Sequence, residues 1–399
     1  PCRHQTMGEQ SQAANNGCDP LEYFAGMIDH CYDAAELAKN QGRPIVGILC
    51  EFTPRELIFA AGGLPVCLCG GSAETIPPAE QFLPANLCPL IKSTFGYQVT
   101  GRNPFLKWAD LVVAETTCDG KKKMFELLAA HKPLYVLELP QKADDPEAFE
   151  HWVAEVRKLR QHLEARFQVV ITNEKLVEAI HLMNRERHLR RQLADLLTAH
   201  PPPLTGRQLL EFKSIISGLP AHLQQYERAF DYYRQGGRTS PAYASARGPV
   251  RVLLTGVPLV HGAERVVELI ESCGAVVVCM ENCTGLKPIL EDVDAATPDP
   301  LRALAAKYYH LPCSVMTPNR RRFDTLRALA GKFRPDCLIE LVWQACLTYD
   351  VESFHVRNLC LGELRLPYLK ITTDYSPADS SRITARVAAL CETVRDRAP

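Results

Sequence analysis

The sequence lacks the features that mark several classes of protein. No stretch approaches the roughly 20 apolar residues of a membrane-spanning helix. Charges nearly cancel, with 45 basic and 46 acidic residues, so nothing indicates a nucleic-acid or membrane-surface partner. The opening residues, PCRHQTMGEQSQAANNGCDP, contain no apolar core of a signal peptide. We therefore expect a cytoplasmic protein with neither a membrane span nor a nucleic-acid ligand.

Two motifs of nucleotide-binding proteins are also missing. The chain has no GxxxxGK[ST] sequence, and the glycines of TGVPLVHG (255–262) do not complete a GxGxxG pattern. Any step that needs ATP is therefore expected to depend on another protein.

Cysteine, by contrast, is abundant, with 16 in 399 residues. A reducing compartment disfavours disulfides, and the spacings do not match zinc sites, which usually pair ligands two to four residues apart. Cys67 and Cys69 form a close pair, but within a strand LPVCLCG their side chains would point to opposite faces. Five cysteines lie in apolar periodic stretches typical of core thiols: Cys273, Cys279, Cys337, Cys360 and Cys391.

Six further cysteines each follow a short apolar segment where the chain enters a loop. Along the sequence they form two sets of three: Cys50, Cys88 and Cys118, then Cys283, Cys313 and Cys346. Three converging thiolates can hold a cubane iron–sulfur cluster, so two sets predict room for two cubanes. The alternative is that these residues are inert buried thiols.

Alternating strand and helix patterns predict an α/β fold with parallel, doubly wound sheets. Strands are expected at 44–49, 64–70, 110–117, 133–140, 250–256, 275–282, 337–343 and 368–372. Residues 145–235 are helical in pattern, including one helix over 206–234, and 235–249 is rich in Gly, Ser and Pro. The predicted division is a tail and helix (1–43), a first α/β domain (44–200), a helical connection and linker (201–249) and a second α/β domain (250–399). Because ligands bind beyond the carboxyl ends of parallel strands, a site between the domains is expected.

Several long motifs resemble the D-component family of 2-hydroxyacyl-CoA dehydratases and benzoyl-CoA reductases, and among these most closely the double-cubane cluster proteins. They are CEFTPRELIFAAGGLPVCLCGG, LPANLCPLIKSTFGY, ETTCDGKKKMFELL, ENCTG, LPCSVMTPN, WQACLTYDVES and TTDYSPADSSRITARVAAL. The resemblance extends over about residues 20–396. It implies two Rossmann-like (flavodoxin-like) domains, a homodimer, and iron–sulfur chemistry between the domains.

The resemblance also implies a division of the six cysteines. Classical dehydratase subunits hold one 4Fe-4S cluster through residues that match Cys88, Cys118 and Cys346. The double-cubane branch adds Cys50, Cys283 and Cys313 and holds an 8Fe-9S cluster, reduced by a separate ATP-hydrolysing activator that carries its own cluster. The function implied is ATP-dependent reduction of small molecules at low potential. A single-cluster dehydratase subunit and a non-enzymatic electron-transfer or cluster-storage protein remain alternatives.

A few other residues are candidates for roles at such a site. Glu51 and His261 are possible proton-transfer groups, although a surface or core role is common for such residues. Lys121, Lys122 and Lys123 open a predicted helix, where cations are unfavourable. They are expected either to offset cluster charge or to receive an electron donor, and the alternative is a solvated first turn without such a role.

Overall fold

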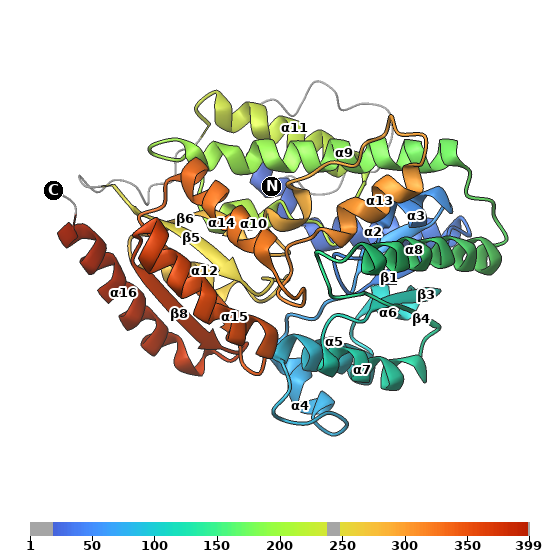
Figure 1. Ribbon diagram of the computed structural model, residues 1–399, viewed down its shortest axis with the longest axis horizontal. Coiled ribbons are helices and arrows are strands. Elements are labelled where there is room, and N and C mark those ends of the chain that lie inside the picture. Colours follow the sequence, from blue (N-terminus) through green and yellow to red (C-terminus); the bar gives the residue numbers. More distant parts are fainter. Residues whose placement is uncertain (1–18, 238–247, 398–399) are drawn as a thin grey trace.

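The computed structural model describes residues 19–237 and 248–397, and it contains two four-stranded sheets in which all strands are parallel (Figure 1). The predicted α/β fold with two Rossmann-like domains is confirmed. The sheets have the orders β2-β1-β3-β4 and β6-β5-β7-β8. The strands are β1 (Ile45–Ile48), β2 (Leu64–Cys67), β3 (Leu111–Glu115), β4 (Leu134–Leu137), β5 (Val250–Gly256), β6 (Ala275–Glu281), β7 (Cys337–Trp343) and β8 (Tyr368–Thr373).

Strand order reverses direction once in each sheet, between β1 and β3 and between β5 and β7. Such a reversal leaves a crevice beyond the carboxyl ends of the two central strands, where ligands bind in doubly wound folds. Cys50 follows β1, Cys118 follows β3, and Cys346 follows β7. The topology therefore places these cysteines at the crevices.

Helices cover both faces of each sheet because the central strands are apolar on both sides. In β1, Ile45 packs into one apolar cluster, whereas Val46 and Ile48 pack into another. The helices are α1 (Pro20–Ala25), α2 (Met27–Asn40), α3 (Arg55–Ala60), α4 (Ile76–Ala79), α5 (Pro89–Thr100), α6 (Pro104–Trp108), α7 (Asp119–Ala129), α8 (Pro146–Phe167), α9 (Asn173–Asp195), α10 (Gly206–Glu211), α11 (Pro220–Arg234), α12 (Arg265–Ser272), α13 (Pro300–Tyr309), α14 (Arg320–Phe333), α15 (Leu347–Asn358) and α16 (Ser380–Arg397).

The prediction of one continuous helix over 206–234 is wrong. The structure has two helices there, α10 and α11, joined by a loop at 212–219. Gly218 has a φ of 73°, which a helix interior does not allow, and Pro220 begins α11. Ile216 of this loop forms a bridge with Val66 at the edge of the first sheet. The loop thus reaches the site described below.

The domain boundaries stay a prediction. One helix of the second α/β stretch packs on helices of the first. Helix α13, from the second α/β stretch, packs on α8 and α9 rather than on its own sheet. The indole Nε1 of Trp152 in α8 donates to the carbonyl of Ala305 in α13 at 3.0 Å. The tail at 1–18 and most of the predicted linker, 238–247, lie outside the described residues.

The two domains meet closely beside the site. Tyr375 donates its hydroxyl to the carbonyl of Gly70 at 3.1 Å, and a Cβ on Gly71 would lie 2.2 Å from the carbonyl oxygen of His261. A larger residue than glycine at position 71 would therefore push these loops apart. Within the part of the chain that the structure describes, no helix is both long and apolar enough to cross a membrane.

Candidate functional site

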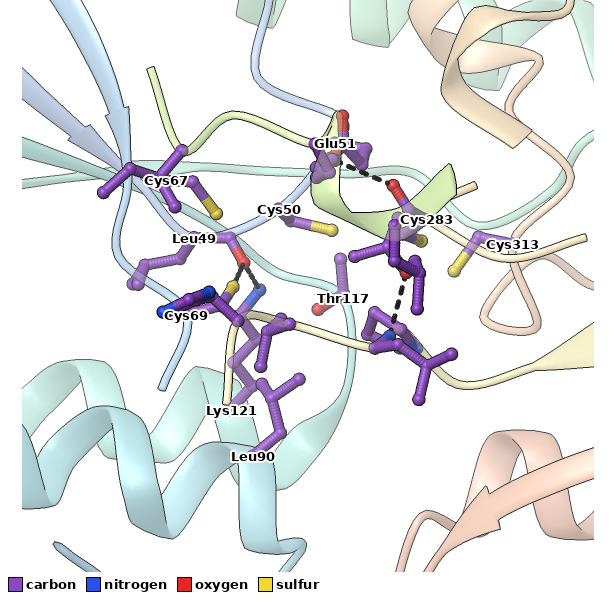
Figure 2. Close-up of a pocket in the computed structure, with 18 of the residues that line it drawn as sticks. Leu49, Cys50, Glu51, Cys67, Cys69, Leu90, Thr117, Lys121, Cys283 and Cys313 are labelled. Atoms are coloured by element: carbon purple, nitrogen blue, oxygen red, sulfur yellow. Dashed lines mark hydrogen bonds and ion pairs between the residues drawn. The ribbon is translucent and has the colours of Figure 1, made fainter. Parts of the chain in front are cut away.

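Two adjoining cavities lie between the domains. The first, which we call the Cys283 cavity, has a volume of about 170 Å³. In Figure 2, Cys50, Cys283 and Cys313 direct their sulfur atoms toward one space in this cavity. Its other cysteines are Cys67, Cys69 and Cys118, and its charged lining residues are Glu51, Lys121, Glu211, Lys213 and Glu264, with His261 nearby on the same wall.

The second cavity, which we call the Cys346 cavity, is larger, with a volume of about 990 Å³. It is lined by Cys88, Cys118 and Cys346, together with Trp343 from the end of β7. The two cavities have several lining residues in common: Leu90, Thr117, Cys118, Lys121, Pro258 and Tyr349. All six candidate cysteines thus lie on two cavities that share a wall.

The spatial grouping differs from the order of the cysteines along the chain. Each cavity takes cysteines from both domains, whereas the sequence order suggested one set of three from each. Cys118 lines both cavities, and the division of the six cysteines implied by the resemblance stays a prediction. Parallel strands explain this arrangement, because the carboxyl ends of both sheets face the same crevice.

Three of the cysteines occupy the same position in three different helices. Cys88, Cys118 and Cys346 are the N-cap residues of α5, α7 and α15. The positive end of a helix dipole and the free amide groups of its first turn favour a thiolate at this position. Sequence analysis placed these residues only at the ends of strands. Pro89, directly after Cys88, could have indicated that a helix begins there, since proline often occupies the first position of a helix.

The pKa values of these three thiols show how the helix ends act. A hydrogen bond between Cys88 and Cys346 has the largest effect, lowering the pKa of Cys88 and raising that of Cys346 well above its usual range. Burial raises the pKa of Cys118. First-turn amide groups act in the opposite direction to burial, from Lys121 on Cys118 and from Tyr349 on Cys346.

At three thiols of the Cys283 cavity, burial has the largest effect on the pKa and favours the protonated form. It raises the pKa of Cys50, Cys283 and Cys313. Lys121 opposes this shift at Cys50, and Lys287 opposes it at the other two thiols. A metal that binds thiolates here must therefore displace protons, and the two buried ammonium groups would lower the cost.

The three consecutive lysines do not form one surface. Lys121 is buried and lines both cavities, where its Nζ donates to the carbonyl of Leu49 at 2.5 Å. Lys122 and Lys123 are exposed and pair with Asp119 and Glu126 of the same helix. Of the three lysines, therefore, Lys121 alone places a positive charge within the site.

Glu51 lies in the Cys283 cavity as part of a buried ion network. Its carboxylate is 2.8 Å from Arg55 and 3.2 Å from Lys213. Burial disfavours the charged form, but these cations together with Arg190 lower the pKa to about 2. The side chain is a carboxylate at neutral pH, which suits charge balance better than proton donation. Its proposed catalytic role stays a prediction.

Lys213 is a residue of this site that sequence analysis missed. It lies in the loop between α10 and α11, and its Nζ also donates to the carbonyl of Cys283 at 3.2 Å. The breaker sequence Gly218–Leu219–Pro220 was the available signal for that loop. His261 lines the same cavity from the loop after β5, with its Nδ1 3.7 Å from Glu264 and 58% of its side chain exposed.

The expectation that Cys67 and Cys69 point apart is wrong. Strand β2 ends at Cys67, so strand alternation does not extend to Cys69. Both residues line the Cys283 cavity, and a hydrogen bond between them lowers the pKa of Cys67 and raises that of Cys69. The Cys69 thiol also donates to the carbonyl of Leu49 at 3.1 Å.

The donor set fits an iron–sulfur cluster. Every described cysteine is a free thiol, and soft thiolates select iron–sulfur and other thiophilic metals over hard cations. The three thiols of the Cys346 cavity have first-turn amide groups directed at them, and hydrogen bonds to sulfur tune such clusters. Cys50, Cys283 and Cys313 would fit a second cluster in the adjoining space.

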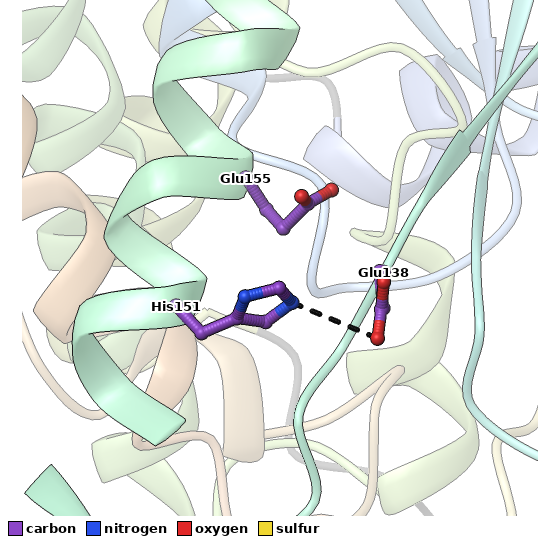
Figure 3. A group of neighbouring side chains, drawn as sticks. All are labelled: Glu138, His151 and Glu155. Atoms are coloured by element: carbon purple, nitrogen blue, oxygen red, sulfur yellow. Dashed lines mark ion pairs between the residues drawn. The ribbon is translucent and has the colours of Figure 1, made fainter. Parts of the chain in front are cut away.

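A separate group of potential ligands consists of Glu138, His151 and Glu155 (Figure 3). Among the described residues it is the one set of three or more whose ligand atoms all lie within 4.8 Å of one another. The His151 Nε2 is 3.6 Å from Glu138, and Glu155 is 2.6 Å from Lys158. These side chains therefore satisfy one another and Lys158 without an ion.

Comparisons with known proteins match most of the chain. A family model described as 2-hydroxyglutaryl-CoA dehydratase, D-component, matches residues 50–394. The putative dehydratase subunit YjiM of Escherichia coli (strain K12) is 39% identical over 364 residues, covering 89% of this chain and 92% of that protein. The (R)-phenyllactyl-CoA dehydratase beta subunit of Clostridium sporogenes is 21% identical over 367 residues, covering 89% and 93%. A benzoyl-CoA reductase subunit of Thauera aromatica is 23% identical over 300 residues, covering 74% of each chain.

The range matched by the family model contains all six candidate cysteines, from Cys50 at its first residue to Cys346. It also contains both sheets except for β1. The named relatives are dehydratase subunits and a reductase subunit. The chain belongs to the 2-hydroxyglutaryl-CoA dehydratase D-component family.

Proposed function

We propose that this protein is an iron–sulfur reductase that reduces small molecules with a double-cubane (8Fe-9S) cluster. A separate ATP-hydrolysing activator, with a cluster of its own, would supply the electrons. The observation that supports this most is the distribution of thiols, with Cys88, Cys118 and Cys346 on one cavity and Cys50, Cys283 and Cys313 on the adjoining one. When bound, such a cluster supplies electrons at low potential.

The surrounding residues have complementary tasks. Lys121, Lys213 and Lys287 place positive charge near the thiolates, which favours the deprotonated sulfur that a cluster requires. The ion pair with Glu51 keeps the ammonium group of Lys213 in position beside the site. Apolar side chains such as Leu49 and Leu259 line the Cys283 cavity and limit the access of water.

A second candidate is a dehydratase subunit that holds a single 4Fe-4S cluster on the Cys346 cavity. Two observations favour it. The three thiols of that cavity are the ones at helix N-termini, and its volume of about 990 Å³ suits a larger substrate. Several relatives are named as dehydratase subunits.

Turnover assays would test the proposal. Purified protein, its cognate activator and a strong reductant are combined under anaerobic conditions, with and without ATP. We expect reduction of small multiply bonded molecules only when ATP is present. Equal activity without ATP would contradict the proposal, and dehydration of a 2-hydroxyacyl-CoA at a comparable rate would favour the second candidate. Absence of both reactions with an intact cluster would indicate an electron carrier.

A cysteine variant separates the two candidates further. Replacing Cys283 by Ser removes a thiol of the Cys283 cavity and leaves the Cys346 cavity unchanged. The reductase proposal predicts loss of ATP-dependent reduction, whereas a single-cluster dehydratase would retain its activity. Cys391→Ser is the matched control, because Cys391 is buried in the apolar core on the inner face of α16.

A further inference from the structure

A third, small cavity adjoins the Cys283 cavity inside the second domain. It has a volume of about 30 Å³ and is lined by residues of α9, α10, β6 and the 3-10 turn η4 (Lys287–Ile289). Helix α10 packs on β6 (Figure 1), and α9 packs on η4. We call this space the Val278 cavity. Most of its lining side chains are apolar and buried, among them Leu193, Ala194, Phe212, Val278, Met280 and Leu286.

The polar side chains that line the Val278 cavity have partners within the protein. Arg190 donates from Nη2 to the carbonyl of Thr284 at 3.2 Å. Lys213 donates from Nζ to the carbonyl of Cys283 at 3.2 Å, and the Thr284 hydroxyl donates to Oδ1 of Asn282 at 2.9 Å. A buried water needs two to four polar partners, whereas an apolar cavity stays dry and accepts apolar guests such as xenon. The lining therefore favours an apolar occupant over water.

The Val278 cavity shares a wall with the Cys283 cavity. Leu210, Lys213 and Thr284 line both spaces, and Thr284 directly follows Cys283 in the chain. Lys213 and Thr284 are held by the hydrogen bonds described above, whereas the side chain of Leu210 has no polar group and is held by packing alone. One layer of side chains thus separates the two cavities, and Leu210 is its apolar member.

We propose that the Val278 cavity binds small apolar molecules of two or three heavy atoms and holds them on the way to the Cys283 cavity. One water needs about 10–15 Å³ of such space, so about 30 Å³ suits a guest of that size. A molecule with one double or triple bond fits, whereas an acyl-CoA does not. The role as a route to a cluster rests on the proposed reductase activity, but the binding of an apolar guest does not.

Xenon binding tests the site directly, because xenon is apolar and its position can be read from anomalous scattering. Crystals of the full chain are pressurised with xenon, and we expect a peak in the Val278 cavity of the wild type. Val278→Ile adds one carbon to a side chain that lines the cavity, so most of the peak should be lost. Ala194→Val narrows the cavity from α9 and should have the same effect, which covers the case of a poorly folded strand variant.

Val276→Ile is the matched control for the xenon experiment. Val276 precedes Val278 by two residues on the same face of β6 and is buried in the same apolar cluster, but it does not line the cavity. The control should retain the full xenon peak. A wild type without xenon in the Val278 cavity, or undiminished peaks in both Val278→Ile and Ala194→Val, would overturn the proposal.

Turnover tests the route separately from the binding site. With ethyne, an apolar molecule with two carbon atoms, as the substrate of the cluster-loaded protein and its activator, Val278→Ile should raise KM about fivefold and leave kcat unchanged. Val276→Ile should change neither constant. An unchanged KM in a variant that has lost its xenon peak would show that the cavity is not on the route. A wild type that reduces nothing with ATP present would contradict the proposed function, while the xenon map would still decide the binding site.

Discussion

At the scale of single residues, the site depends on buried charges that sequence position alone does not reveal. Lys121 lines both cavities; burial alone would lower its pKa, but the neighbouring Cys50 and Glu115 raise it above its usual range. Glu51 is surrounded by cations and stays ionised. These two residues support different predictions, one about the reduction potential of a bound cluster and one about stability.

Replacing Lys121 by Met should lower the reduction potential of the bound cluster. A buried positive charge stabilises the reduced, more negative state, so its removal should shift the potential by about −60 mV, on the order of 1.4 kcal/mol. A redox titration followed by electron paramagnetic resonance measures the shift. Lys121→Arg should preserve most of the potential, and Lys122→Met, at an exposed residue of the same helix, should leave it unchanged. An unshifted potential in a Lys121→Met protein with full iron content would contradict the assigned role.

Replacing Glu51 by Gln should destabilise the protein in a pH-dependent way. The folded pKa of about 2 lies below the ordinary value of 4.5, so the carboxylate contributes stability above about pH 4.5 and loses it as the pH falls toward 2. We expect a loss of about 2 kcal/mol in the free energy of unfolding at pH 7 and a smaller loss at pH 3, measured by denaturant titration.

Glu150→Gln is the control for this prediction, because Glu150 forms an exposed ion pair with Arg302. Such pairs contribute little to stability, so the control should stay close to the wild type at both pH values. A loss of the same size at both pH values in Glu51→Gln would show that the effect is one of packing rather than charge.

At the scale of secondary-structure elements, apolar patterning predicted the strands better than the helices. All eight predicted strands are present, because strands of buried parallel sheets are short runs of Val, Ile and Leu that few other segments imitate. Helix α5 was not predicted, although Pro89 marks its start. The single helix expected over 206–234 is two helices in the structure. The apolar spacing continues across the loop between them, but the positive φ of Gly218 is incompatible with a helix.

The same limits explain which parts of the site were foreseen. The six cysteines were identified from their positions after strands and from the resemblance, and the structure places them on two adjoining cavities. Lys213 was not foreseen because it lies in the unpredicted loop. Cys67 and Cys69 were assigned to opposite faces because the strand was expected to continue past Cys67, where it ends.

The loop between α10 and α11 supports a prediction at this scale. Gly218 has a φ of 73°, and a Cβ there would lie 2.7 Å from Cζ of Phe59. Gly218→Ala should lower the free energy of unfolding by about 2 kcal/mol, from backbone strain and the close contact together. Thermal unfolding measures the loss. Gly42→Ala is the control, since Gly42 has a φ of 70° with no atom within 4 Å of the added Cβ, and should cost about 1 kcal/mol. Equal losses in the two variants would show that the contact with Phe59 has no effect.

At the scale of the whole molecule, the site exists only where the two domains meet. Each cavity combines cysteines from both sheets, and α13 packs on helices of the first domain. The hydrogen bond from Tyr375 to Gly70 and the close approach of Gly71 to His261 hold the loops of the two domains together. We therefore expect cluster binding to require the intact chain.

The central claim is that six thiols hold two cubanes in the adjoining cavities, and the iron content of the anaerobically purified protein tests it most directly. Two cubanes predict about eight irons per chain, with acid-labile sulfide in similar amount. Cys118→Ser should lose most of this iron, because Cys118 lines both cavities, whereas Cys391→Ser should lose none. About four irons per chain, unchanged in Cys283→Ser, would contradict the claim.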